Sequence, residues 1–237
     1  MDRLTRKELK SDKFALEVEH TVDYVSEHRQ QVILYGAIVA AIVVIAGGIY
    51  LYRNHTRAVR QEELHVALRI QDASVGPSQT PGNTSMLSFP TEQAKQQALV
   101  KAFTNLAVQD SGTEEGTIAT YYLGTNAADK GNLADAAKYL GEAANSSYSN
   151  YASMAKLALA RIYAGQGKLA DGEKLIRSVI DHPTDFVSKE DATIALARLL
   201  APTRPEEARK LLEPLRTARS SISRAALSAL AGLAQPK

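Results

Sequence analysis

Two pairs of neighbouring carboxylates, Glu114 with Glu115 and Glu206 with Glu207, come closest in this sequence to a set of residues that could do acid–base chemistry. Paired acids can share the roles of proton donor and proton acceptor. Each pair, however, stands at the start of a predicted helix, where negative side chains are stabilised by the helix dipole. We therefore interpret both pairs as helix-capping residues.

The other patterns that carry chemistry are missing from the sequence. There is no cysteine, which excludes disulfides, thiolate zinc sites and cysteine nucleophiles. No phosphate-binding G-x-x-x-x-G-K-[ST] loop and no G-x-S-x-G nucleophile motif occurs. The histidines are scattered without metal-binding i, i+4 spacing; they are His20, His28, His55, His65 and His182. We expect no enzymatic activity, no metal and no cofactor. A hydrolase with an unrecognised site is the alternative, and it predicts a deep pocket with perturbed carboxylates.

Composition predicts an all-α protein. Lys and Arg (28) nearly balance Asp and Glu (26), so the net charge of +2 predicts no attraction to nucleic acid. Tryptophan is absent and alanine is abundant, which favours closely packed helices over sheets.

Residues Val32–Tyr52 form an uncharged apolar run near the N-terminus. As a helix this run spans about 31 Å, which matches the hydrocarbon core of a bilayer. A buried helix of a soluble protein would be shorter, and its apolar residues would be less uniformly distributed around the helix. A cleaved signal peptide would have a shorter apolar stretch and a short basic leader, whereas 31 residues with many acids precede this run. We predict an uncleaved transmembrane helix.

The charges beside this run do not decide its orientation. Arg53, Arg57, Arg60 and Arg69 follow it closely, and taken alone they place the C-terminal part in the cytoplasm. Long domains, however, translocate largely regardless of such charges, and further basic residues lie near the N-terminus. Both orientations stay open on the residues alone.

A repeat with a period of 36 residues occupies the C-terminal half. Residues 131–140 and 167–176 share Gly, Leu, Ala, Asp and Lys in register, and the next copy contains Ala208. Gly131 and Gly167 are predicted to end a first helix in the left-handed conformation. Ala136, Gly172 and Ala208 are small, so that two helices can cross closely. Each pair of helices buries its apolar stripe only by stacking on its neighbours.

These features divide the chain into five predicted segments. They are a charged N-terminal tail with a juxtamembrane helix (1–31), the transmembrane helix (32–52), a helical stalk (53–73), a linker rich in Pro, Gly and Ser (74–90) and a helical repeat domain (91–237). The repeats are expected near residues 117–150, 151–187 and 188–220.

The repeat resembles the tetratricopeptide (TPR) pattern. Leu123-Gly124, Gly131, Ala136, Leu140 and Ala143 carry the resemblance in the first copy, and later copies keep the small residue and the following apolar positions. The sequence departs from the pattern in lacking Trp and in having a longer period. The resemblance implies an α-solenoid that binds proteins.

The whole layout is similar to that of the ancillary subunit family of the SecYEG translocon, also called YfgM-like. The similarity rests on the charged tail, the anchor ending in Tyr50-Leu51-Tyr52-Arg53, the stalk and the degenerate repeats. It implies a bacterial inner-membrane protein with a cytoplasmic N-terminus and a periplasmic repeat domain. The partners it implies are the translocon and periplasmic chaperones. The alternative is a cytoplasm-facing scaffold of an envelope or signalling complex.

By the TPR pattern, the first helices of the repeats line a concave protein-binding face. Its predicted residues are Ile118, Tyr121, Thr125, Asp129, Met154, Leu157, Arg161, Glu190 and Thr193. Tyr121 and Thr125 occupy two positions where chaperone-binding repeats need Lys and Asn. The resemblance therefore does not extend to their two-carboxylate clamp.

Overall fold

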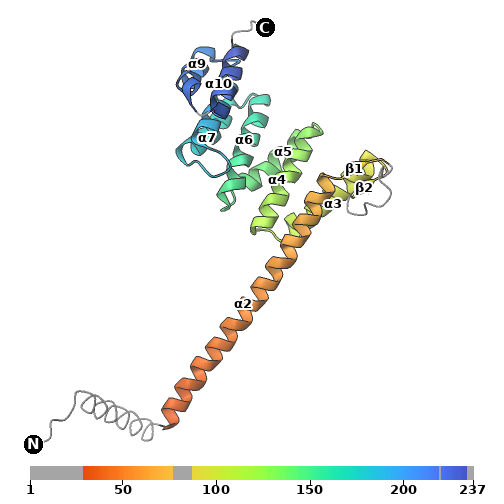
Figure 1. Cartoon of the computed structure of the whole chain (residues 1–237), viewed down its shortest axis with the longest axis vertical. Helices are drawn as coiled ribbons and strands as arrows, with labels where there is room; N and C mark the ends of the chain where they lie inside the picture. Colours follow the sequence, from red (N-terminus) through yellow and green to blue (C-terminus); the bar gives the residue numbers. More distant parts are fainter. Residues whose placement is uncertain (1–28, 77–86, 219, 234–237) are drawn as a thin grey trace, which may run out of the picture. The chain divides into compact units, whose positions relative to one another are not determined.

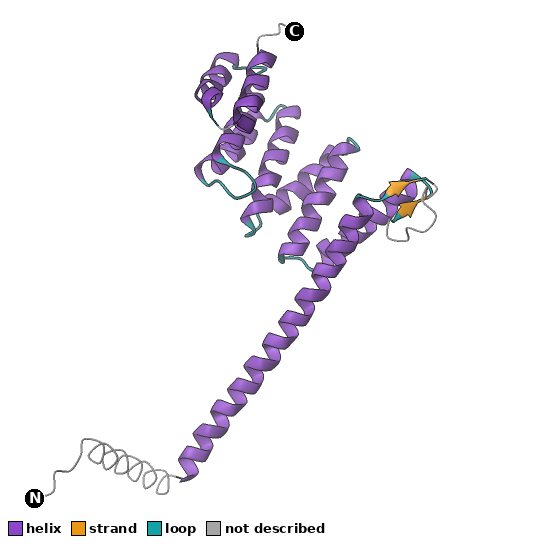
Figure 2. Ribbon diagram, in the orientation of Figure 1, coloured by secondary structure: helices purple, strands orange, loops and turns teal. Residues whose placement is uncertain are grey.

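The computed structural model describes residues 29–76, 87–218 and 220–233, and it divides into two compact units, Met1–Ala58 and Val59–Lys237. Within the described residues the regular elements are helices, apart from two strands of two residues each (Figure 2). The all-α class is therefore confirmed. Most of the predicted N-terminal tail and the middle of the predicted linker lie outside the described residues.

The helix α2, Arg29–Gln71, runs without interruption through the predicted anchor and most of the predicted stalk. In the first unit its apolar side chains are exposed; Val44, for example, is 73% exposed. It is the one helix in the described part of the chain that is long and apolar enough to cross a membrane. A helix satisfies its own backbone hydrogen bonds, which allows it to lie in lipid.

The second unit begins with the last turns of α2 and with α3, Glu92–Gln109. Thr91 caps α3 as its side chain accepts a hydrogen bond from the Ala94 amide at 3.1 Å. Ala67 of α2 is buried together with Leu99 and Phe103 of α3. The strands β1, Ser74–Val75, and β2, Ser88–Phe89, pair in parallel between the two helices.

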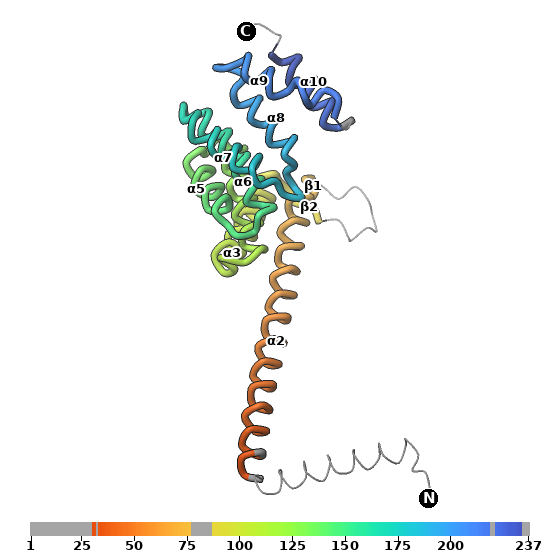
Figure 3. Tube along the Cα trace, turned by 90° about the vertical axis from the view of Figure 1, so that its left-hand side faces the viewer, coloured from red at the N-terminus to blue at the C-terminus, as the bar shows by residue number. Residues whose placement is uncertain are grey.

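Helix pairs follow in chain order and each helix packs on the next (Figures 1 and 3). They are α4 (Glu114–Asp129) with α5 (Leu133–Ala144), α6 (Ser149–Gly165) with α7 (Leu169–Asp181), and α8 (Lys189–Leu200) with α9 (Pro205–Leu212). The apolar stripes of the pairs meet in buried clusters along the stack. This is the predicted α-solenoid.

The repeat positions behave as the 36-residue period predicts. Gly131 and Gly167 have φ of +75° and +77°, the left-handed region that glycine adopts at low cost. Ala136 and Ala208 are fully buried. A Cβ at Gly172 would lie 2.8 Å from the Ala160 carbonyl oxygen, so only glycine allows α6 and α7 this close approach.

The C-terminal end of the solenoid is covered by elements that the sequence pattern did not predict. A 3-10 helix, Glu213–Thr217, leads into α10, Ser220–Leu233. Ala226 of α10 is buried, and Ile222 and Leu230 pack against the same core cluster as α8 and α9. The last repeat therefore has a capping helix, as solenoids need at their ends.

Candidate protein-binding face

Five aromatic rings lie in an unbroken series of contacts across the solenoid, and we name them the aromatic row. Phe103 of α3 stacks on Tyr122 of α4, with ring centroids 5.1 Å apart. Tyr122 meets Tyr121 edge-on at 5.5 Å, and Tyr121 meets Tyr151 of α6 at 5.6 Å. Tyr151 meets Phe186, in the segment between α7 and α8, at 5.4 Å.

The aromatic row leads from the core to the surface. Phe103 is 1% exposed, the three tyrosines are partly buried, and Phe186 is 53% exposed. Tyrosine combines a large apolar ring with a polar hydroxyl, and its side chain loses little entropy on binding. The row therefore presents partly exposed rings that are held in place by their neighbours.

The surroundings of Tyr121 and Tyr151 raise the pKa of both phenols. Burial raises the pKa of Tyr121, and the nearby Tyr122 adds to this, while the charge of Arg161 opposes it. Burial also raises the pKa of Tyr151, followed by the effects of Tyr122 and Tyr121. Both hydroxyls thus stay protonated and able to donate hydrogen bonds at physiological pH.

The predicted concave-face residues divide into several environments. Tyr121 belongs to the row, and Arg161 of α6 is exposed and close enough to act on Tyr121 electrostatically. Thr125 donates to the Tyr122 carbonyl oxygen at 3.1 Å. Asp129 is exposed at the end of α4.

The other predicted residues lie on α4, α6 and α8. Ile118 is 8% exposed, while Met154 and Leu157 pack partly buried against the C-terminal core cluster. Glu190 and Thr193 lie partly buried on α8, and Thr193 donates to the Lys189 carbonyl oxygen at 2.7 Å. Whether these residues bind a partner stays a prediction.

Sequence reasoning missed four members of the row: Phe103, Tyr122, Tyr151 and Phe186. They do not recur at the 36-residue period, because ring contacts join neighbouring repeats at unequal positions. The available signal was a Tyr-Tyr doublet on one first helix and another Tyr at the start of the next.

The carboxylate pair Glu114 and Glu115 does more than favour a helix start. Thr113 provides the side-chain cap of α4 by accepting from the Gly116 amide at 3.1 Å. Glu115 is 5% exposed, and its carboxylate accepts from Arg60 Nε of α2 at 3.4 Å. A second carboxylate, from Asp110, lies 3.9 Å from the same Arg60 nitrogen. Glu115 is therefore the buried half of a partly buried ion pair between α2 and α4, a role that its position at a helix start did not reveal.

The second pair has a different environment. Glu207 forms ion pairs with Arg177 and Arg204, whereas Glu206 is exposed. Among the described residues no group of three or more His, Asp or Glu side chains could hold a metal ion.

Together these features define a class of protein: a helical-repeat solenoid that follows a long apolar helix capable of crossing a membrane. The chain belongs to the tetratricopeptide repeat-like domain family, whose model matches residues 27–176, more than half of its length. The matched region starts before the apolar part of α2 and ends within α7. Neither a curated protein nor a solved structure gives a significant match. Domains of this kind are generally interaction modules without catalytic activity, and they imply protein partners.

Proposed function

We propose that this chain is a non-enzymatic, membrane-anchored protein-binding module, and that the exposed part of the aromatic row is its main contact surface. The proposal rests mainly on the aromatic row. It joins α3, α4, α6 and the segment before α8 through ring contacts of 5.1 to 5.6 Å and ends in an exposed Phe186. Aromatic side chains on a rigid scaffold are typical anchors of protein interfaces.

We further propose that the chain lies in the inner membrane of a bacterium, with a cytoplasmic N-terminus and a periplasmic solenoid. Its partners would then be the SecYEG translocon and periplasmic chaperones. This proposal rests on the similarity of the layout to the ancillary translocon subunits. Four arginines after the apolar run favour the opposite orientation, but one of them, Arg60, has a structural role that weakens this argument. Arg60 pairs with Glu115 and Asp110, so packing gives it a reason other than topology.

Site-specific crosslinking in native membranes tests the partner assignment. A photo-crosslinking amino acid replaces Phe186 in the full-length chain, because this side chain is half exposed at the end of the row. The matched control carries the same amino acid at Lys174, an exposed position on α7. We expect translocon or periplasmic chaperone subunits to be crosslinked from position 186 and not from 174. Recovery of neither class from position 186 would refute the assignment.

The competing function is a scaffold that faces the cytoplasm. Arg53 and Arg57 favour it, since both are exposed immediately after the apolar run. Protease added to spheroplasts separates the two orientations. Digestion of the solenoid from outside excludes the cytoplasmic scaffold, whereas protection until the membrane is lysed excludes the periplasmic module.

A further inference from the structure

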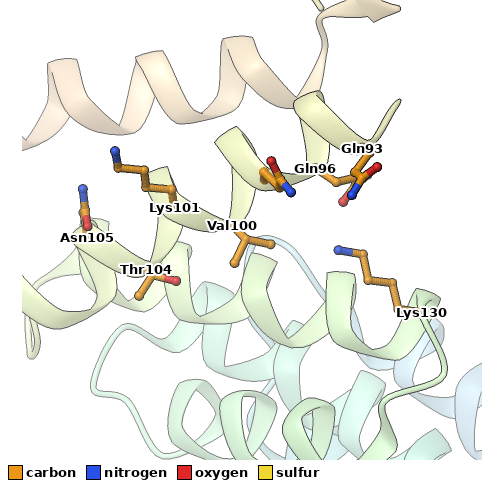
Figure 4. A pocket seen from close by; sticks show the side chains of 8 residues that line it. Gln93, Gln96, Val100, Lys101, Thr104, Asn105 and Lys130 are labelled. Atoms are coloured by element: carbon orange, nitrogen blue, oxygen red, sulfur yellow. The ribbon is translucent and has the colours of Figure 1, made fainter. Parts of the chain in front are cut away.

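A groove of about 610 Å³ runs along one face of α3, separate from the aromatic row. Its lining includes Gln93, Gln97, Lys101 and Asn105 of α3, together with Lys130 at the end of α4. Figure 4 shows the α3 side chains spaced along the helix, with Lys130 extending toward it. A volume of this size falls within the range of typical ligand pockets.

The lining follows from the amphipathic pattern of α3. Gln93, Gln97, Lys101 and Asn105 recur every four residues and therefore share one side of the helix. Phe103 and its apolar neighbours are buried on the other side. From Gln93 to Asn105 the polar side extends for about 18 Å, at the usual rise per helical residue. An extended polypeptide of about five residues covers that length.

The charge of the groove is of one sign. Its lining contains Lys101 and Lys130 and no acidic residue. Neither lysine forms an ion pair within residues 29–76, 87–218 and 220–233. Lys95 on the same helix differs, because its ammonium donates to the Ala73 carbonyl oxygen at 2.7 Å. Glu92, in the first turn of α3, already accepts a hydrogen bond from Gln96.

The uncharged part of the lining suits a polypeptide backbone. The amide of Gln96 already donates to Glu92 and accepts from Asn126. The side chains of Gln93, Gln97 and Asn105 each offer two donors and one carbonyl oxygen, which match the alternating N–H and C=O groups of an extended strand. Val100, 36% exposed, adds a small apolar contact in the middle of the groove. A phosphate or lipid headgroup would use the two lysines and would leave the exposed amide side chains to water, whereas an extended backbone can use both.

We infer that this groove binds an extended, acidic segment of a partner protein, with carboxylates paired to Lys101 and Lys130 and the backbone bonded to the amide side chains. This second contact surface does not depend on the aromatic row. A partner that engages both surfaces would be held by two contacts on one chain, which raises the effective concentration at each.

Fluorescence anisotropy tests the inference with the full-length chain in detergent. The probe is a labelled, end-blocked octapeptide of alternating Glu and Ser, and the comparison probe replaces Glu with Lys. The variant K101E/K130E reverses the charge of the groove. The control K174E/K210E makes the same change in net charge at two exposed lysines of α7 and α9.

We expect the acidic probe to bind, the basic probe to bind at least tenfold more weakly, and K101E/K130E to lose at least tenfold in affinity for the acidic probe. The control variant should stay within twofold of the natural chain, and higher salt should weaken binding. Equal losses in both double variants would overturn the inference. So would absent binding of the acidic probe together with lysine-dependent binding to vesicles of anionic lipid. The variant Y121A/Y151A, which alters the aromatic row, should keep the affinity for the acidic peptide. The proposed function of the row and the inference about the groove can therefore fail independently of each other.

Discussion

The two parts of α2 have the same secondary structure but opposite side-chain environments. In the first unit its apolar side chains are exposed on every side, from Ile33 at 59% to Leu51 at 68%. In the second unit one side of the helix is buried, and Ala67 is 0% exposed against Leu99 and Phe103 of α3. A uniformly apolar surface suits lipid, whereas a one-sided stripe suits a protein core.

The difference teaches how one continuous helix can serve two environments. A helix in a bilayer requires only apolar side chains, so the part of α2 in the first unit needs no packing partner of defined shape. The solenoid needs small and large side chains at fixed positions, because its interior is closely packed. Substitutions in the first part should therefore respond to polarity, and substitutions in the second part to volume and pairing.

The largest effect is expected from charge in the apolar part. The double variant V43R/V44R should make the free energy of membrane insertion less favourable by about 6 kcal/mol, from typical costs of arginine at a helix centre. The fraction of chain that resists alkaline extraction from membranes measures this. V43L/V44L should remain fully inserted. Unchanged extraction of the arginine variant would contradict a membrane-spanning role.

The next largest effect is expected in the core between α2 and α3. F103A removes a ring that is 1% exposed and stacked on Tyr122, so the free energy of unfolding should fall by about 3–5 kcal/mol. Denaturant titration followed by circular dichroism measures the loss. V108A on the same helix should change stability by less than about 0.5 kcal/mol, because Val108 is 71% exposed. Similar losses of unfolding free energy in both variants would contradict the packing of α3 through one face only.

Two arginines of α2 provide a matched test of pairing. R60A leaves the buried carboxylate of Glu115 without its partner and should cost about 1–3 kcal/mol of unfolding free energy. R57A, which changes an exposed side chain three residues earlier, should cost less than about 0.5 kcal/mol. A double-mutant cycle of R60A with E115Q isolates the pair. A coupling energy near zero would show that the pair contributes nothing.

The smallest effect concerns pH and the ion pairs between α7 and α9. The hydrogen bond from Arg204 holds the pKa of Glu173 below its ordinary value, and Arg177 adds to this. The unfolded chain therefore binds this proton more readily, so the pair stabilises the fold above the ordinary glutamate pKa. That contribution, about 0.5–1 kcal/mol for a partly exposed pair, is lost as pH falls through the lowered pKa.

The variant E173Q should lose this part of the acid dependence. The difference in unfolding free energy between the natural chain and E173Q should shrink as pH falls from 6 toward 3. Asp110 contributes with the opposite sign, because burial raises its pKa, but it is common to both proteins and cancels in the difference. A difference that does not vary with pH would contradict the assignment.

Much of the fold could be predicted because its signals are local. The apolar run after residue 31 has the length of a bilayer, and Gly131 and Gly167 end helices through their own backbone conformation. The small residues at positions 136, 172 and 208 mark helix crossings at a constant period, which gives the repeat and its class. The candidate site was predictable only at Tyr121, where the repeat pattern pointed to a first helix.

The sequence by itself determined the helices of the repeats, the one segment apolar enough for lipid, and where the repeats turn. Only the tertiary structure decided that Arg60 meets Glu115 across 55 positions, that five rings from different helices form the aromatic row, and that α10 covers the last repeat. The physical reason is range. Helix propensity, capping and hydropathy act within a few residues of the chain, whereas ring contacts and buried ion pairs depend on where distant helices come together.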